Sequence, residues 1–391
     1  MSATMTRLSY ETQLGQRIQE AFADIFKQDP SIILQVLAHV GREDCTTIDE
    51  ALVAKVKPTL LRVLHNACPE FQSTPATEVT VMDADLLDLW RTAAKDPDTE
   101  PPHWLKHGAP SGIVEPVRDC GIFPRYDPTV DTAEVNAEDI ATEQDFANYA
   151  GVETDPDVRT EVKRIVELGY VMVFENMAQL KAYLKANPVL SKIGVIKKLR
   201  GGKLKVRMVI DSKQSGVSKA TRKFERTQLP RALDVVADGM SLLGTNSEGI
   251  LEFLVADFRD AFFIVPNRRS ERKYFVVYYN GKYLVFLKTT QGSRGAPLTW
   301  ARVIALVMRL TQSVVGCQTC RISTYVDDPI IAAIGTKLER HTTFATILLL
   351  WACLGLPMAM DKAKLGQEIT WTSATFLPKP EGITVRVKPG L

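Results

Sequence analysis

The spacing of apolar residues separates a helical N-terminal part of the chain from a later part that is rich in strands. Apolar side chains recur at helical spacing from Tyr10 to Phe26 and from Ala84 to Trp90, so helices are predicted there. Residues 1–115 are therefore interpreted as a mainly helical N-terminal extension, with Pro101-Pro102 interrupting the pattern. Docking and substrate contact are the two roles considered for it.

The later part alternates buried strands with apolar helices, which predicts an α+β fold. Residues 254–256 read as a buried strand, and β-rich residues flank the turn 325–329. Residues 300–309 read as a largely buried helix. The uncharged run 342–360 is long enough to cross a membrane, but its three threonines, glycine and proline favour a buried helix that covers the sheet.

Two adjacent carboxylates are the most informative chemistry in the chain. Asp327 and Asp328 lie between two predicted strands, which places both at a tight turn. Neighbouring like charges beside a packed sheet repel and are partly desolvated, so a divalent cation is the expected partner. Asp257 ends the strand 254–256, and the intervening chain is long enough to bring it back beside the turn. Together they could hold a pair of magnesium ions for phosphoryl transfer.

A glycine-containing block lies between the two aspartate motifs. Gly292 and Gly295 would let the backbone approach a substrate closely, and Pro297 stands where a helix would begin.

Charge is distributed unevenly although the net charge is only +2. Residues 127–157 contain ten acidic residues and no lysine or arginine, so 116–190 is interpreted as an acidic connector. Residues 192–226 contain eight lysines and four arginines against Asp211 and Glu225. Such a run is often a solvated face, but its position before the first aspartate strand favours a surface that follows template phosphates.

In this order, three motifs resemble the palm motifs of reverse transcriptases, as found in retrotransposon and retroviral polymerases. They are Asp257-Phe-Arg-Asp-Ala-Phe-Phe, Gln291-Gly-Ser-Arg-Gly-Ala-Pro and Tyr325-Val-Asp-Asp. Residues 194–211 are similar to the fingers hairpin of that family, and 355–373 to its last palm elements. The resemblance covers about residues 190–377. It implies a right-hand polymerase fold, with fingers and an antiparallel palm sheet backed by helices in residues 191–391 and the thumb absent or truncated.

The resemblance also implies roles for individual residues. The metal-binding triad, for two Mg²⁺ or Mn²⁺ ions, would be Asp257, Asp327 and Asp328. Nucleotide contacts would come from Lys198, Arg207, Phe258, Asp260, Phe262, Gln291 and Gly292. Phe262 takes the position of a steric gate against the ribose 2′-hydroxyl, and Lys362 is a candidate acid near the leaving pyrophosphate. Nucleic-acid contacts are expected from Lys197, Lys205 and Trp371. The family commonly has a glycine where this chain has Ser373, in the element that grips the primer.

The function predicted from this pattern is RNA-directed DNA synthesis from dNTPs on an RNA or DNA template-primer. Two alternatives stay open: a decayed or domesticated nucleic-acid-binding copy, and an RNA-dependent RNA polymerase, against which Phe262 argues. The six cysteines and the absence of an apolar leader indicate an intracellular protein, and no membrane partner is expected. Protein partners cannot be assigned from the sequence.

Overall fold

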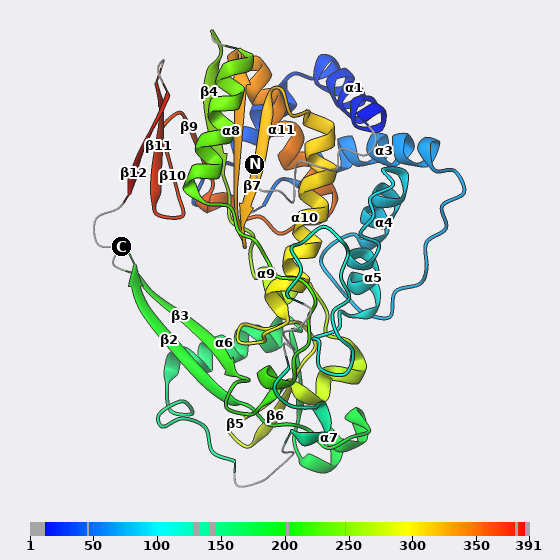
Figure 1. Ribbon diagram of the computed structural model, residues 1–391, viewed down its shortest axis with the longest axis vertical. Helices are drawn as coiled ribbons and strands as arrows, with labels where there is room; N and C mark the ends of the chain where they lie inside the picture. The colour runs from blue at the N-terminus through cyan, green and yellow to red at the C-terminus, as the bar shows by residue number, and fades with distance from the viewer. Residues whose placement is uncertain are drawn as a thin grey trace.

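The computed structural model describes residues 12–44, 47–127, 133–140, 146–200, 203–246, 248–379 and 382–387. Helices and antiparallel sheets are combined in it, so the α+β class is confirmed (Figure 1). An upper body contains the largest sheet and the N-terminal helices, and a lower body contains a long two-stranded hairpin (Figure 1).

The upper body is built on four antiparallel strands in the order β7-β8-β4-β9. These strands are β4 (Ile250–Val255), β7 (Cys320–Tyr325), β8 (Asp328–Gly335) and β9 (Lys364–Gly366). Successive residues of β4 face opposite sides, so Phe253 and Val255 enter one core cluster and Leu254 enters another. Because both faces are covered, β4 is almost continuously apolar. The antiparallel sheet expected for this part of the chain is confirmed.

Helices cover one face of this sheet, and a smaller sheet with one helix covers the other. α10 (Ala296–Val315) and α11 (Lys337–Cys353) pack on the Leu254 face. On the Phe253 face lie α8 (Ala232–Thr245) and the sheet of β10 (Ile369–Trp371), β11 (Ala374–Lys379) and β12 (Gly382–Val387). The expected buried helix in 342–360 is confirmed for residues 342–353, because α11 ends at Cys353 before Gly355 and Pro357. Within the described part of the chain, one helix, α10, is long and apolar enough to cross a membrane, and 78% of its most apolar 18-residue stretch is buried.

Five N-terminal helices pack around α10 and α11 and share their core. They are α1 (Thr12–Gln28), α2 (Ser31–Leu37), α3 (Glu50–Ala67), α4 (Ala84–Ala93) and α5 (Glu100–His107). Gly15 allows α1 to approach α10 closely, because a Cβ there would lie 2.0 Å from the carbonyl oxygen of Ser313. Pro101 and Pro102 lie in the first turn of α5, where the missing N–H leaves no intrahelical bond unmade. The residues expected as a helical extension are therefore packed directly on the sheet-covering helices.

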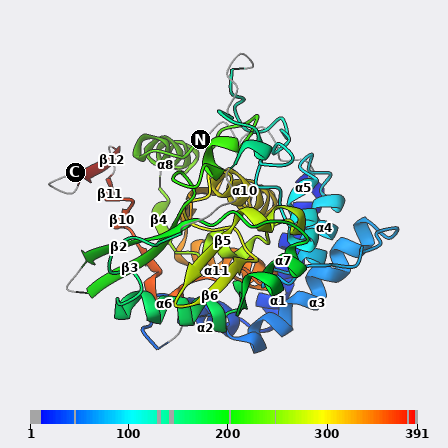
Figure 2. The ribbon, with the colours of Figure 1, turned by 90° about the horizontal axis from the view of Figure 1, so that it is seen from below.

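The lower body contains a three-stranded sheet and the hairpin. The sheet has the order β1 (Val171–Phe174), β6 (Lys282–Phe286) and β5 (Val276–Tyr279), and the hairpin consists of β2 (Lys192–Arg200) and β3 (Lys203–Asp211). α6 (Pro156–Glu167) and α7 (Met177–Leu184) lie beside them, so 116–190 contributes regular elements to this body. The hairpin extends from the side opposite to the N-terminal helices (Figure 2). Short helices complete the fold: α9 (Ala261–Ile264), η1 (Ala137–Asp139), η2 (Val217–Ala220), η3 (Arg269–Tyr274) and η4 (Met360–Lys362).

Candidate active site

Asp257 lies beside the turn that carries the other two aspartates, which we call the aspartate turn (residues 325–329). The last paired residues of β4 and β8 are Val255 and Ile330. Beyond them, the N–H of Ala256 donates to the carbonyl of Pro329 across 3.2 Å, and the N–H of Phe258 donates to that of Asp327 across 2.8 Å. Asp257 therefore lies between two residues, Ala256 and Phe258, whose N–H groups both bind the turn. This pairing brings the two sequence motifs together.

The side chain of Asp257 is bound to Lys362. The Lys362 ammonium donates to the Asp257 carboxylate across 3.1 Å, and both side chains reach solvent. Among the described residues, no group of three or more His, Cys, Asp or Glu side chains is already arranged to hold a metal ion. The backbone thus brings Asp257 beside the turn that carries Asp327 and Asp328, while Lys362 supplies a positive charge to Asp257.

The carboxylate of Asp260 is held by the lower body. Arg164 of α6 donates to it across 2.7 and 3.2 Å, and the Tyr170 hydroxyl donates across 3.2 Å. Burial, with the nearby Asp260 carboxylate, raises the pKa of Tyr170 to about 12. These two bonds tie the chain after β4 to the lower body, and the nucleotide contact expected at Asp260 stays a prediction. Neither partner could be found from the sequence, because no local pattern links them to Asp260.

Three phenylalanines after β4 have three different environments. Phe258 is 1% exposed and packs edge-to-face with Trp300 and Trp351, so only its backbone could line a nucleotide pocket. Phe262 is partly buried and lines a cavity. If the strand continued, successive residues would face opposite sides, which predicts that Phe263 points into the core of the palm sheet. This is wrong, because the segment is the helix α9 and Phe263 instead stacks on Tyr170, with ring centroids 4.6 Å apart.

An apolar cavity of about 180 Å³ adjoins the aspartate turn. Phe262 and Val326 line it beside the turn, and one face of α10 forms much of its wall. The rest of the wall comes from Ser323 and Thr324 of β7, from Phe123 and from residues 227–230, which carry no recognisable motif. Its lining residues on α10 are Pro297, Trp300, Ala301, Ile304, Ala305 and Met308.

The glycine-containing block packs against the base of the hairpin. The carbonyl of Gln291 accepts a hydrogen bond from the N–H of Ile210 across 3.2 Å. Gly292 has a φ of 102°, and a Cβ there would lie 2.0 Å from the Ile210 carbonyl oxygen. The close approach expected of this glycine is therefore to β3 of the same chain. Gln291 and Gly292 connect the hairpin to the start of α10.

Strand geometry divides the basic residues of the hairpin between two faces. Ile196 pairs with Arg207, so Lys198, two residues after Ile196, shares a face with Arg207 and both are exposed. Lys197 points the other way and binds two aspartates at the start of α6, at 2.7 Å from Asp155 and 2.5 Å from Asp157.

These bonds raise the pKa of Lys197 and neutralise its charge. Lys197 is thus occupied by two aspartates of the same chain, and the nucleic-acid contact expected there stays a prediction. Lys205 pairs with Lys198 in the strand register, and its side chain lies outside the described residues.

Trp371 lies under the aspartate turn. Its side chain is 3% exposed, and its indole N–H donates to the carbonyl of Asp328 across 2.9 Å. This burial leaves the Trp371 side chain almost no exposed surface for the nucleic-acid contact expected there. In the next two residues, Thr372 and Ser373 have φ values of 43° and 76°, as in a type I′ hairpin turn. Ser373 thus adopts the backbone conformation that a glycine would favour, although it has a side chain.

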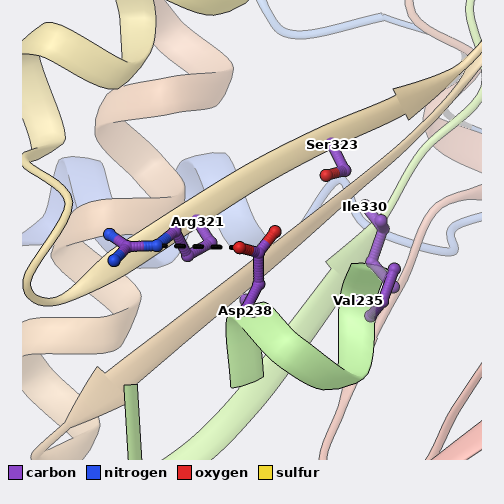
Figure 3. Close-up of a pocket in the computed structure, with 6 residues that line it drawn as sticks. Val235, Asp238, Arg321, Ser323 and Ile330 are labelled. Carbon is purple, nitrogen blue, oxygen red and sulfur yellow. Dashed lines mark ion pairs between the residues drawn. The ribbon is translucent and has the colours of Figure 1, made fainter. Parts of the chain in front are cut away.

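A much smaller cavity, of about 10 Å³, lies between α8 and the β7–β8 hairpin (Figure 3). The Nε atom of Arg321 lies 3.8 Å from a carboxylate oxygen of Asp238, and burial raises the pKa of that carboxyl. A space of this size holds about one water molecule, so it is not a ligand site. Its other lining residues are Val235, Ser323, Ile330 and Ala332.

No protein-family model and no curated protein matches this sequence. Among solved structures it is similar to a foamy viral protease-reverse transcriptase, designated dRH, in complex with double-stranded DNA. The TM-score is 0.46 at 15% identity, covering 82% of this chain and 50% of that chain. Another foamy viral protease-reverse transcriptase structure with double-stranded DNA gives 0.44 at 16% identity, covering 67% and 49%. The chain spans about half the length of both, and the likeness is too distant to show membership of a family.

Proposed function

We propose that this chain is an RNA-directed DNA polymerase domain that extends a primer by magnesium-dependent phosphoryl transfer. The observation that carries the proposal is the backbone bond between Phe258 and Asp327, which sets Asp257 beside the aspartate turn next to an apolar cavity. Carboxylates suit the metal end of a nucleoside triphosphate, and an apolar cavity suits its base.

The donor set fits magnesium. Asp257, Asp327 and Asp328 offer hard carboxylate oxygens, which Mg²⁺ and Mn²⁺ prefer. When bound, magnesium would offset the charge that develops on the transferred phosphoryl group. Lys362 binds Asp257 at 3.1 Å in the structure described here. Once released from that carboxylate, its ammonium would donate a proton to the leaving pyrophosphate.

The remaining contacts would set the nucleotide and its sugar. Lys198 and Arg207 share an exposed face of the hairpin and would neutralise the triphosphate, one as a point charge and the other as a fork. Phe262 projects into the cavity beside the turn, where its ring would exclude a ribose 2′-hydroxyl. RNA or DNA template-primer and dNTPs are the partners that this arrangement implies.

Primer extension on an RNA template tests the reaction, and metal binding tests the site separately. Asp257→Asn is expected to lower extension by orders of magnitude, because removing a ligand disrupts the metal clamp. The same substitution should weaken Mn²⁺ binding, measured by electron paramagnetic resonance. Asp361→Asn is the matched control, since that nearby carboxylate is bound to Arg259 at 2.7 Å. Equal Mn²⁺ affinity in both variants and wild type would refute the assigned site.

Competition between dNTPs and rNTPs tests the sugar gate. Phe262→Val should admit ribonucleotides and retain deoxynucleotide incorporation. Ile304→Val, which opens the same cavity from α10, should leave sugar selectivity unchanged. Unchanged sugar selectivity in Phe262→Val would refute the assignment of Phe262 as the steric gate. Ribonucleotide incorporation by the wild type would favour an RNA polymerase, and template binding without extension or Mn²⁺ binding would favour a non-catalytic nucleic-acid-binding protein.

A further inference from the structure

Two buried tryptophans hold the backbone of the aspartate turn from opposite sides. The indole N–H of Trp300, on α10, donates to the carbonyl of Val326 across 2.8 Å. The indole N–H of Trp371, on β10, donates to the carbonyl of Asp328 across 2.9 Å. The two accepting carbonyls lie immediately before and after the carbonyl of Asp327. Together with the backbone bonds from the end of β4, these indoles engage four consecutive carbonyls, those of residues 326–329.

The two indoles belong to different core clusters. Trp300 is fully buried among the residues between the sheet and α10, and Trp371 is 3% exposed on the face covered by α8. A buried indole N–H usually has an acceptor, and both of these N–H groups have one in the same short turn. The turn is therefore fixed from both faces of the four-stranded sheet and not by its own hairpin alone.

The conformation of the turn explains why it needs such support. Val326 has a φ of 58°, in the left-handed region that a β-branched residue rarely adopts. A backbone in that region is retained where surrounding contacts enforce it, and such positions cluster at functional sites. Releasing either flanking carbonyl would let the turn relax, and the directions of the Asp327 and Asp328 side chains would change with it.

We propose that Trp300 and Trp371 are positioning residues that orient the carboxylates of Asp327 and Asp328 for a divalent cation. The effect on cation binding rests on the proposed function. The clamp itself, by which we mean the two indole hydrogen bonds to the carbonyls of Val326 and Asp328, is a property of the fold. Neither indole N–H needs to touch the cation or the nucleotide, because both act through the backbone of the turn.

The experiment compares Trp300→Phe and Trp371→Phe with Trp90→Phe. Phenylalanine keeps an aromatic ring and removes the N–H. Trp90 is the matched control because it is fully buried and its Nε1 has no hydrogen-bond partner in the described structure. Trp90→Phe therefore reports the cost of the smaller ring alone.

Hydrogen exchange of a peptide covering residues 320–330 measures the clamp without any assumption about activity. Exchange should be faster in Trp300→Phe and Trp371→Phe than in the wild type or Trp90→Phe, because the turn opens more easily. Mn²⁺ affinity should fall by about tenfold in each, as when an outer partner of a metal ligand is removed. The double variant Trp300→Phe/Trp371→Phe should lose less Mn²⁺ affinity than the product of the two single losses, because removing either hydrogen bond already frees the turn.

The outcomes separate the two proposals. Unchanged exchange in both variants overturns the positioning role, whatever the activity of the chain. Faster exchange with wild-type Mn²⁺ affinity also overturns it, because the turn would then move without consequence for the cation. A third outcome is faster exchange in both variants while the wild type neither binds Mn²⁺ nor extends a primer. The two indole hydrogen bonds would then still hold the turn, but both their role in positioning a cation and the proposed function would be refuted.

Discussion

Removing the carboxylate of Asp98 is expected to destabilise the protein strongly, because it leaves a buried arginine without its counter-charge. Asp98 lies between α4 and α5, and its carboxylate accepts two bonds from Arg302 of α10, one of them across 2.9 Å. The two side chains are 0% and 1% exposed. Arg302 also donates to the carbonyl of Arg118 across 2.6 Å and lies over the Trp104 ring at 4.5 Å.

The loss can be bounded from these contacts. Breaking a buried ion pair by removing one partner costs about 3–5 kcal/mol. The remaining contacts of Arg302 favour the lower end, so Asp98→Ala should lower the free energy of unfolding by about 3 kcal/mol. Asp44→Ala is the control, since the Arg42–Asp44 pair has a similar distance, 2.6 Å, but side chains 54% and 71% exposed. Its cost should stay below about 1 kcal/mol.

Urea unfolding followed by circular dichroism measures both variants. A double variant, Asp98→Ala with Arg302→Met, removes both charges and should recover much of the loss, because the cost comes from the uncompensated charge. Equal costs for Asp98→Ala and Asp44→Ala would refute the reasoning from burial. A double variant no more stable than Asp98→Ala would show that packing, and not charge, sets the cost.

Three further predictions test other parts of the structure. Lys198→Gln should reduce the salt dependence of primer-template affinity by a slope of roughly 0.9 in a filter-binding titration. Lys197→Gln should leave the slope unchanged, since that ammonium is already paired with two aspartates. Phe263→Val should lower the free energy of unfolding by about 2 kcal/mol through the loss of its ring stacking, with sugar selectivity unaltered, and greater rNTP use would contradict this. Burial lowers the pKa of Lys288 to about 8 from 10.5, so between these values the unfolded state binds more protons and stability should rise with pH. Lys288→Met should remove this rise in urea titrations at pH 8 and 10, and an unchanged pH dependence would refute the assignment.

Local pattern was sufficient for the elements that carry the candidate site. The hairpin around Asp327, the strand before Asp257 and the helix after Pro297 were predicted from apolar runs and turn residues, and each is present. Such features depend on neighbours within a few residues, so the order of residues determines them. The meeting of the two aspartate motifs could also be anticipated, because the chain between them is long enough for strands to return side by side.

The partners of individual side chains were decided only by tertiary structure. Lys197 and Lys198 are adjacent in sequence, but the alternation of the strand turns Lys197 towards two aspartates at the start of α6 and Lys198 to the opposite face of the hairpin. Asp260 is bound by Arg164 of α6, 96 residues earlier in the chain, and the indole of Trp371 on β10 is bound to the carbonyl of Asp328. These contacts join segments distant in sequence, and nothing in the local pattern marks either partner. The sequence alone therefore determined where the carboxylates stand along the chain, and the packing of the two bodies decided what surrounds them.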